Sequence, residues 1–136
     1  MWIVKQGFFA GAGGANDNKD AANYSPAREP SACTVGAAES DNQKASYSNW
    51  GSIVDIQPPG SQILSAIPNG ESKAWSGTSM ACPHVVGVAA LLISADEAKG
   101  ADACDKMKKM ALKDIIQGIP SGTTKDLLFN DNPGAK

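Results

Sequence analysis

The stretch that most constrains the fold runs from residue 76 to residue 92, where a small polar turn leads directly into a long apolar segment. Past Pro83 almost every residue is apolar or small, which predicts a helix in the middle of a core. Thr78 or Ser79 can cap its first N–H groups, and Pro83 is tolerated where N–H groups lack an intrahelical partner. Because the helix is buried, a hydroxyl at its N-terminus would be held rigidly. The positive end of the helix dipole would lie behind that hydroxyl. An ordinary capped helix and a reactive serine both remain possible interpretations.

Composition narrows the class of protein. The chain has 136 residues, 42% of them hydrophobic, and a formal net charge of −2, which is typical of one globular domain spanning residues 1–136. This balance does not indicate nucleic-acid binding or disorder. No run approaches the roughly 18 apolar residues of a membrane span, so no membrane partner is expected. The first six residues lack the order of a signal peptide, so export would depend on a segment outside this chain.

Short apolar segments precede the central helix. We expect strands wherever such a segment is bounded by turn residues, at 1–10, 34–37, 53–56 and 62–66. Residues 11–18, rich in glycine and alanine, are predicted as a loop, either flexible or closely approached by another part of the backbone. Residues 41–48 are polar and loop-like.

A second helix is predicted after the central one, over residues 101–115. Its apolar residues share one face and its lysines lie mainly on the other, as in an amphipathic surface helix. The remaining chain is rich in turn-forming residues, which flank a short apolar segment at residues 127–129 that is expected to anchor this part of the chain.

The order of residues in the central stretch is more informative than their composition. Gly77-Thr78-Ser79-Met80-Ala81, followed by Pro83-His84-Val85 and Gly87, resembles the nucleophile block of the subtilisin-like serine proteases. The resemblance implies that Ser79 attacks the peptide carbonyl. It also implies an α/β three-layer fold with a mostly parallel sheet, here truncated to its C-terminal half, and a serine endopeptidase that hydrolyses protein or peptide substrates.

Residues 16–27 are similar to the oxyanion-hole segment of the fungal, proteinase K-like branch of that family. Asn16 matches the asparagine whose amide stabilises the tetrahedral intermediate, and the Ser79 N–H would be the second donor. Ala15 departs from the family, which has glycine there, and it is strained if the position needs a positive φ. Taken alone, an asparagine in a glycine-rich loop is usually a turn residue.

The same resemblance implies a specificity pocket. Gly13, Gly14 and Ala15 match one wall of the family's primary pocket, and Tyr24 lies near its back. Small walls leave room for an apolar or aromatic side chain at the residue before the cut, so broad specificity is expected.

Three cysteines leave at least one thiol unpaired, so their number alone does not fix the redox compartment. Cys33 and Cys104 match a disulfide of the proteinase K-like enzymes, whose loop of about 70 residues would stabilise by roughly 4 kcal/mol in the chain-entropy model. The match implies secretion, with a vacuolar location as the alternative, and a propeptide inhibitor in the precursor. Cys82 is then the odd thiol, interpreted as buried and inert rather than reactive.

A structural calcium site is also implied, although catalysis needs no cofactor. Pro30 and Ala32 match positions whose backbone carbonyls bind Ca²⁺ in the family, and Asp55 matches its carboxylate ligand. Without the resemblance, Asp55 would simply end a strand.

The sequence contains one histidine, His84, yet a serine nucleophile needs a general base within hydrogen-bond reach. His84 follows Ser79 by about 140° and 7.5 Å along a helix, so the two should not face each other. An α/β-hydrolase is excluded because no histidine follows at long range. In the family, the aspartate and histidine blocks would precede Met1.

Two hypotheses follow from this pattern. In one, the chain is the C-terminal part of an endopeptidase that is active only when the N-terminal half is supplied. In the other, it is an incompetent fragment or pseudoenzyme that acts as an antigen or binding partner.

Overall fold

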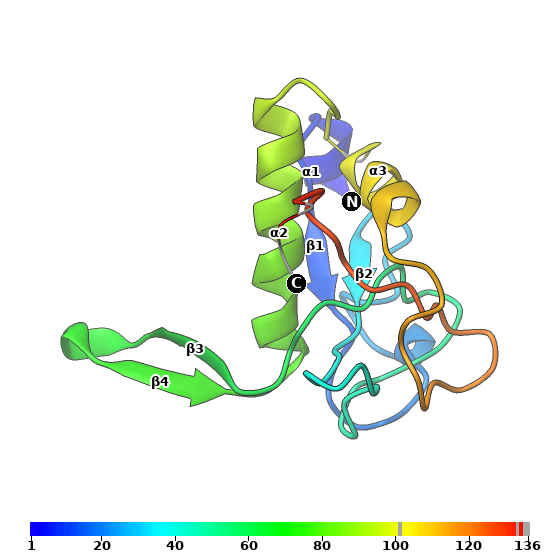
Figure 1. The fold of residues 1–136 in the computed structure, drawn as a ribbon. Coiled ribbons are helices and arrows are strands. Elements are labelled where there is room, and N and C mark those ends of the chain that lie inside the picture. Colours follow the sequence, from blue (N-terminus) through cyan, green and yellow to red (C-terminus); the bar gives the residue numbers. More distant parts are fainter. Residues whose placement is uncertain (101, 133, 135–136) are drawn as a thin grey trace.

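A computed structural model describes residues 1–100, 102–132 and 134. Its centre is a two-stranded parallel sheet of β1 (Gly11–Gly13) and β2 (Cys33–Val35), in register from Gly11 opposite Cys33 to Gly13 opposite Val35. The long helix α2 (Thr78–Ser94) packs beside β1, and α3 (Asp102–Met110) contacts α2 (Figure 1). A helix packed on parallel strands confirms the α/β class that the resemblance implied.

The glycine-rich run forms a strand at its start, whereas a loop was predicted. A Cβ added at Gly11 would lie 3.1 Å from Cys82 Sγ, and one at Gly13 would lie 3.0 Å from Thr78 Oγ1. Contacts this short mean that β1 has no room for side chains at these positions, because α2 lies directly against its backbone. The alternative of a close backbone approach was therefore the correct one.

Two predicted strands are absent among the described residues. Residues 1–10 contain instead the one-turn helix α1 (Trp2–Lys5), in which no residue is buried. The segment 53–56 contributes only an isolated bridge between Ile56 and Val35, although Ile56 is fully buried. In both segments apolar composition was a poor guide, since strand formation depends on a partner edge that the local sequence does not specify.

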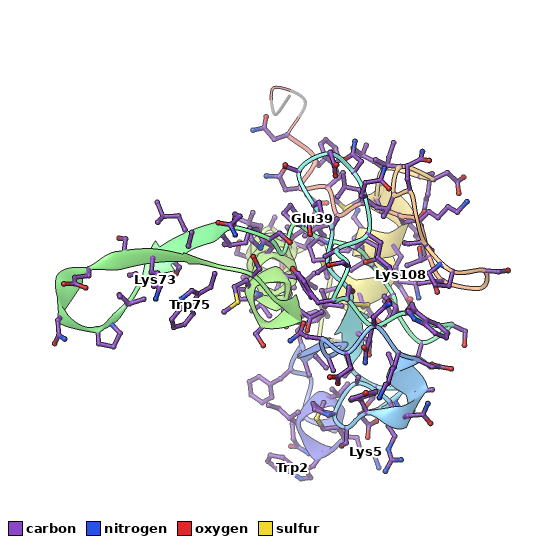
Figure 2. The ribbon with its side chains drawn as sticks, turned by 90° about the horizontal axis from the view of Figure 1, so that it is seen from below. Trp2, Lys5, Glu39, Lys73, Trp75 and Lys108 are labelled. Atoms are coloured by element: carbon purple, nitrogen blue, oxygen red, sulfur yellow. A yellow bond between two sulfur atoms is a disulfide. The ribbon has the colours of Figure 1, made fainter. Side chains whose placement is uncertain are left out.

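The segment 62–66 does form a strand, β3 (Ile63–Ala66), but it pairs with β4 (Ser72–Trp75), which was not predicted. The antiparallel hairpin projects away from the rest of the molecule at the N-terminal end of α2 (Figure 1). Figure 2 shows Lys73 and Trp75 on this arm, far from Lys108. The 3₁₀ turns η1 (Ala21–Asn23) and η2 (Pro68–Gly70) complete the regular structure.

The start of α2 differs from the prediction in two details. Its N-cap is Gly77, whose position provides no side-chain cap, so neither Thr78 nor Ser79 caps the helix. Pro83 lies inside the helix rather than in its first turn. Because proline has no N–H, the carbonyl of Ser79, four residues earlier, loses its helical donor.

Only one face of α2 is buried, although the helix is apolar on all sides. Its buried apolar residues pack in the main core with Val35, Ile56 and Met107; they are Ala81, Val85, Val88, Ala89 and Leu92. Thr78, at the start of the helix, is also buried. Val86 and Leu91 are exposed, Leu91 by 60%. Within the described part of the chain, no helix has the length and apolar character needed to cross a membrane.

The C-terminal part follows the prediction closely. The amphipathic helix forms as α3, shorter than predicted, with Ala103 and Met107 buried; the predicted first residue, 101, lies outside the described residues. The apolar anchor at 127–129 is also present, since Leu127 bridges to both Gln57 and Leu112, and Leu128 packs on the main core.

The exposed face of α2 generates a test of the fold. We expect Leu91→Gln to reduce the binding of the dye ANS while the disulfide-linked fold is retained, because Leu91 is an exposed apolar side chain. The matched Val88→Gln places an amide in the core without a partner and should cost about 1–3 kcal/mol, with loss of near-ultraviolet circular dichroism. Equal effects of the two substitutions would show that this face of α2 is not exposed.

Candidate active site

Ser79 is the second residue of α2 and its side chain is exposed. It lines two hollows. One, of about 380 Å³, runs between the start of α2 and the hairpin, with Leu64, Trp75 and His84 also in its wall. The other is bounded by Gly13, Cys82 and Pro83. Ser79 thus lies on an open surface that approaching chains can reach from both sides.

The Ser79 backbone N–H is available as a hydrogen-bond donor. First-turn N–H groups of a helix have no intrahelical acceptor, and they carry the positive end of the helix dipole. The start of α2 is fixed by its surroundings, since Gly77 N–H donates to the Gly60 carbonyl at 2.8 Å. The N–H of Ser79 is therefore a donor held in a constant position.

Asn16 lies beside this helix start, as the resemblance implied. Its Oδ1 accepts the Thr78 N–H at 2.8 Å, and its amide atoms lie within 4 Å of the position a Gly77 Cβ would take. With Oδ1 bound to Thr78, the orientation of the amide is set and Nδ2 remains a donor. The structure therefore brings Asn16 and Ser79 together at one end of α2.

The loop before Asn16 has the conformation in which alanine is unfavourable. Ala15 has a φ of 78°, a left-handed value that costs an L-residue other than glycine about 1–2 kcal/mol. The departure from glycine at this position thus has the consequence expected from the sequence, which is local backbone strain next to Asn16.

Asn49 holds this strained loop in place, and sequence reasoning missed it. It is fully buried, its Oδ1 accepts the N–H groups of Asp17 at 3.0 Å and Lys19 at 2.9 Å, and its own N–H donates to the Ala15 carbonyl at 3.1 Å. In the sequence it follows a polar segment, so nothing local distinguishes it from an exposed loop residue. The long-range contacts alone reveal its role.

Of the predicted pocket residues, Gly13 lines a hollow with Ser79, whereas Tyr24 packs in a separate cluster. Gly14 N–H donates to the Val35 carbonyl at 2.8 Å. Tyr24 lies in a second small cluster with Ala21, Ala27 and Val54. Burial and the neighbouring Asp17 carboxylate raise the pKa of Tyr24.

His84 is turned toward its own helix. Its Nδ1 lies 3.0 Å from the Met80 carbonyl, and since a carbonyl only accepts, Nδ1 carries the proton in this contact. Cys82 packs against the main core, and burial raises the pKa of its thiol. A raised pKa means less thiolate at neutral pH, which favours the inert interpretation of Cys82.

The disulfide implied by the resemblance is present between Cys33 and Cys104, with Cα atoms 5.7 Å apart and a sequence separation of 71. It joins β2 to α3. Asp55 lies within 4.8 Å of both sulfur atoms, but sulfurs joined to each other cannot act as thiolate ligands for a metal.

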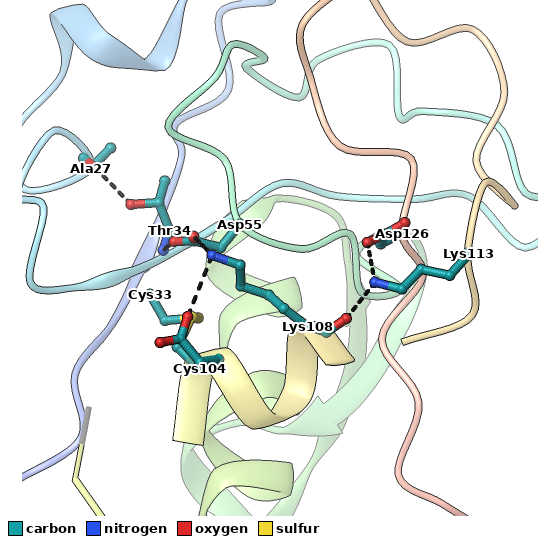
Figure 3. A network of polar contacts seen from close by, with 9 residues as sticks. Ala27, Cys33, Thr34, Asp55, Cys104, Lys108, Lys113 and Asp126 are labelled. Carbon is teal, nitrogen blue, oxygen red and sulfur yellow. Dashed lines mark hydrogen bonds and ion pairs between the residues drawn. A yellow bond between two sulfur atoms is a disulfide. The ribbon is translucent and has the colours of Figure 1, made fainter. Parts of the chain in front are cut away.

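The predicted calcium ligands Pro30, Ala32 and Asp55 line one hollow beside this disulfide, together with Lys108. Lys108 Nζ donates to Asp55 Oδ1 at 3.0 Å, and Thr34 N–H donates to Asp55 Oδ2 at 2.8 Å (Figure 3). Calcium requires six to eight oxygen ligands, whereas an ammonium offers only donors. With Lys108 in this position the residues present do not fit a calcium ion.

The chain is similar to known proteins in sequence. A model of the subtilase family matches residues 4–125. Subtilisin-like protease 1 of Trichophyton rubrum is 47% identical over 133 residues, which cover 98% of this chain and 26% of that protein. A subtilisin-like protease of Coccidioides posadasii is 48% identical over 128 residues, covering 94% and 32%. The chain thus spans about a quarter to a third of these relatives.

A solved structure is also similar. The crystal structure of a cold-adapted subtilisin-like serine proteinase superposes with a TM-score of 0.90 at 42% sequence identity, covering 95% of this chain and 47% of the other.

The role of Asn49 generates a prediction about the loop at Asn16. We expect Asn49→Ala to speed hydrogen exchange at Asp17 and Lys19 by about 5- to 150-fold, because each lost hydrogen bond corresponds to about 1–3 kcal/mol when its partner stays partly buried. Amide exchange followed by NMR measures this directly. The control Asn23→Ala, at an exposed position, should leave both rates unchanged. Unchanged rates in Asn49→Ala would contradict its role as the support of the loop.

Proposed function

The chain belongs to the subtilase family, and on that premise we propose that it is the C-terminal part of the catalytic domain of a serine endopeptidase, with Ser79 as the nucleophile. The observation that carries the proposal is the meeting of Ser79 and Asn16 at the N-terminus of α2, fixed by the 2.8 Å hydrogen bond from Thr78 N–H to Asn16 Oδ1. Two segments far apart in the sequence are thereby joined, which supports assigning the Ser79 hydroxyl, the Ser79 N–H and Asn16 Nδ2 to one site.

This arrangement suits acyl transfer. In the proposed reaction the Ser79 Oγ bonds to the carbonyl carbon of a peptide, the hydroxyl proton passes to a general base, and the carbonyl oxygen becomes an oxyanion. The oxyanion is stabilised by Asn16 Nδ2 and the Ser79 N–H, since donors fixed in advance act where charge develops. Collapse of the intermediate expels the amine, which takes the proton, and water then releases the acyl group.

The general base in this proposal comes from outside the 136 residues. His84 is the one histidine in the sequence, and its contact with the Met80 carbonyl holds the ring against its own helix. A histidine and the carboxylate that orients it are therefore required from the N-terminal half of the catalytic domain. The exposed apolar residues of α2 and of the hairpin, among them Leu91 and Trp75, offer that half a surface on which to pack.

Substrate preference follows from the shape near Ser79. The glycines of β1 and the following Gly14 and Ala15 present little side-chain bulk, so we propose broad specificity with an apolar or aromatic residue before the cut and Tyr24 at the back of the pocket. The substrates are proteins or peptides. The disulfide supports an oxidising location, extracellular or vacuolar, and a propeptide inhibitor is proposed for the precursor.

A second candidate function is favoured by the contact of His84 with the Met80 carbonyl, because this histidine then does not serve Ser79 as a base. By itself the chain would be catalytically incompetent, a fragment or pseudoenzyme that serves as an antigen or binding partner. The two candidates share an ancestry and differ in whether Ser79 ever receives a base.

A fluorophosphonate probe distinguishes these candidates. We expect no labelling of the isolated chain, because Ser79 lacks a base, and stoichiometric labelling at Ser79 when the chain is fused behind the N-terminal part of the catalytic domain of the Trichophyton rubrum relative. Intact-protein mass spectrometry measures the adduct, and Ser79→Ala in the same fusion is the control. Labelling of the isolated chain would disprove the requirement for a second half, and a folded but unlabelled fusion would disprove the peptidase proposal.

The oxyanion role of Asn16 is tested in the same fusion. Asn16→Ala should lower kcat for a chromogenic peptide by about 100- to 1,000-fold with little change in KM, since one transition-state donor is lost. Asn23→Ala is the matched control and should retain full activity. A rise in KM with kcat unchanged would mean that Asn16 binds the substrate no less than the transition state.

A further inference from the structure

Lys108 lies on the predicted polar face of α3, yet its side chain contacts a carboxylate from another segment of the chain. It follows Cys104 by one helical turn, so both residues lie on the same side of α3. The disulfide ties that side of the helix to β2. The Lys108 side chain, 41% exposed, consequently lines the same hollow as Pro30 and Ala32. Its ammonium points toward Asp55 (Figure 3).

The ammonium there is held by charge on two sides. Its Nζ lies 3.0 Å from Asp55 Oδ1 and 3.6 Å from Asp105 Oδ1. The Asp55 side chain is 23% exposed, and its second oxygen is fixed by the Thr34 N–H. The carboxylate is thus oriented from the protein interior and presents one oxygen to the lysine.

We propose that the Lys108 ammonium replaces a structural calcium ion at this site, so that the chain joins the Asp55 segment to α3 with a cation of its own. The ammonium supplies positive charge to the same carboxylate that the resemblance assigns to calcium. A divalent ion on Asp55 would lie next to that ammonium and be repelled by it, and lysine has no lone pair to offer the ion.

Because the Lys108 ammonium is covalently part of α3, its presence at the site does not depend on the calcium concentration of the medium. A free ion loses translational freedom when it binds and leaves when its concentration falls. Lys108 cannot leave, because Cys104 one turn away is covalently joined to Cys33. The site therefore remains neutralised in the absence of calcium. This inference does not depend on the proposed role of Ser79.

Calcium titration of the disulfide-bonded chain by isothermal titration calorimetry tests the proposal. The wild-type chain and the control Lys109→Ala, in which an exposed neighbouring lysine is removed, should show no binding up to about 5 mM CaCl₂, a concentration above the roughly 0.1–1 mM dissociation constants of extracellular calcium modules. Lys108→Ala frees the carboxylate and should bind one Ca²⁺ with a dissociation constant below about 1 mM. Adding Asp55→Asn to Lys108→Ala should abolish that binding.

Two results would overturn the proposal. One is calcium binding by the wild-type chain that Asp55→Asn removes. The other is a folded Lys108→Ala chain, with native circular dichroism, that binds no calcium. If Lys108→Ala does not fold, Lys108→Gln serves in its place, because it keeps most of the stem, removes the charge and adds an oxygen ligand. The wild-type titration decides the first point whether or not either variant folds.

Discussion

The close contact between β1 and the first turns of α2 determines the rest of the structure. It exists because Gly11 and Gly13 have no side chains where Cys82 Sγ and Thr78 Oγ1 would collide with them. This contact places the helix start, which bears Ser79, directly beside the loop that leaves β1, which bears Asn16. Substitution of either glycine would push apart the two elements on which the candidate site depends. The proposed catalytic groups are thus neighbours because a strand without side chains lets a helix approach its backbone.

The loop that carries Asn16 is held against its own conformational preference. Ala15 has a left-handed φ, and a strained residue persists only where its surroundings fix it. Asn49 supplies that restraint through three hydrogen bonds to the loop backbone, and the Thr78 N–H fixes the Asn16 amide from the other side. The proposed oxyanion donor Asn16 is therefore positioned by hydrogen bonds to a buried amide and to a helix terminus.

The opposite end of the sheet is stabilised by covalent and ionic links. The disulfide joins β2 to α3, and the ion pair of Lys108 with Asp55 crosses the same boundary one helical turn away. The continuation of this network through Lys113 and Asp126 attaches the chain after α3 (Figure 3). These contacts lie away from Ser79, so the chain separates the stabilisation of its sheet from the chemistry proposed at the start of α2.

The sequence by itself determined the central helix and the amphipathic α3, because these depend on local periodicity, and it determined the family, because the motif around Ser79 is specific. The α/β class and the pairing of Cys33 with Cys104 were implied by the resemblance to that family, and the structure contains both. The sequence did not determine that residues 11–13 form a strand, that residues 53–56 do not, or that residues 72–75 form a hairpin partner. It also gave no sign of the roles of Asn49 and Lys108. Only the tertiary structure decided these points. Strand pairing, a buried hydrogen bond and an ion pair each require a partner distant in the chain, and a single sequence does not record which distant residues become neighbours.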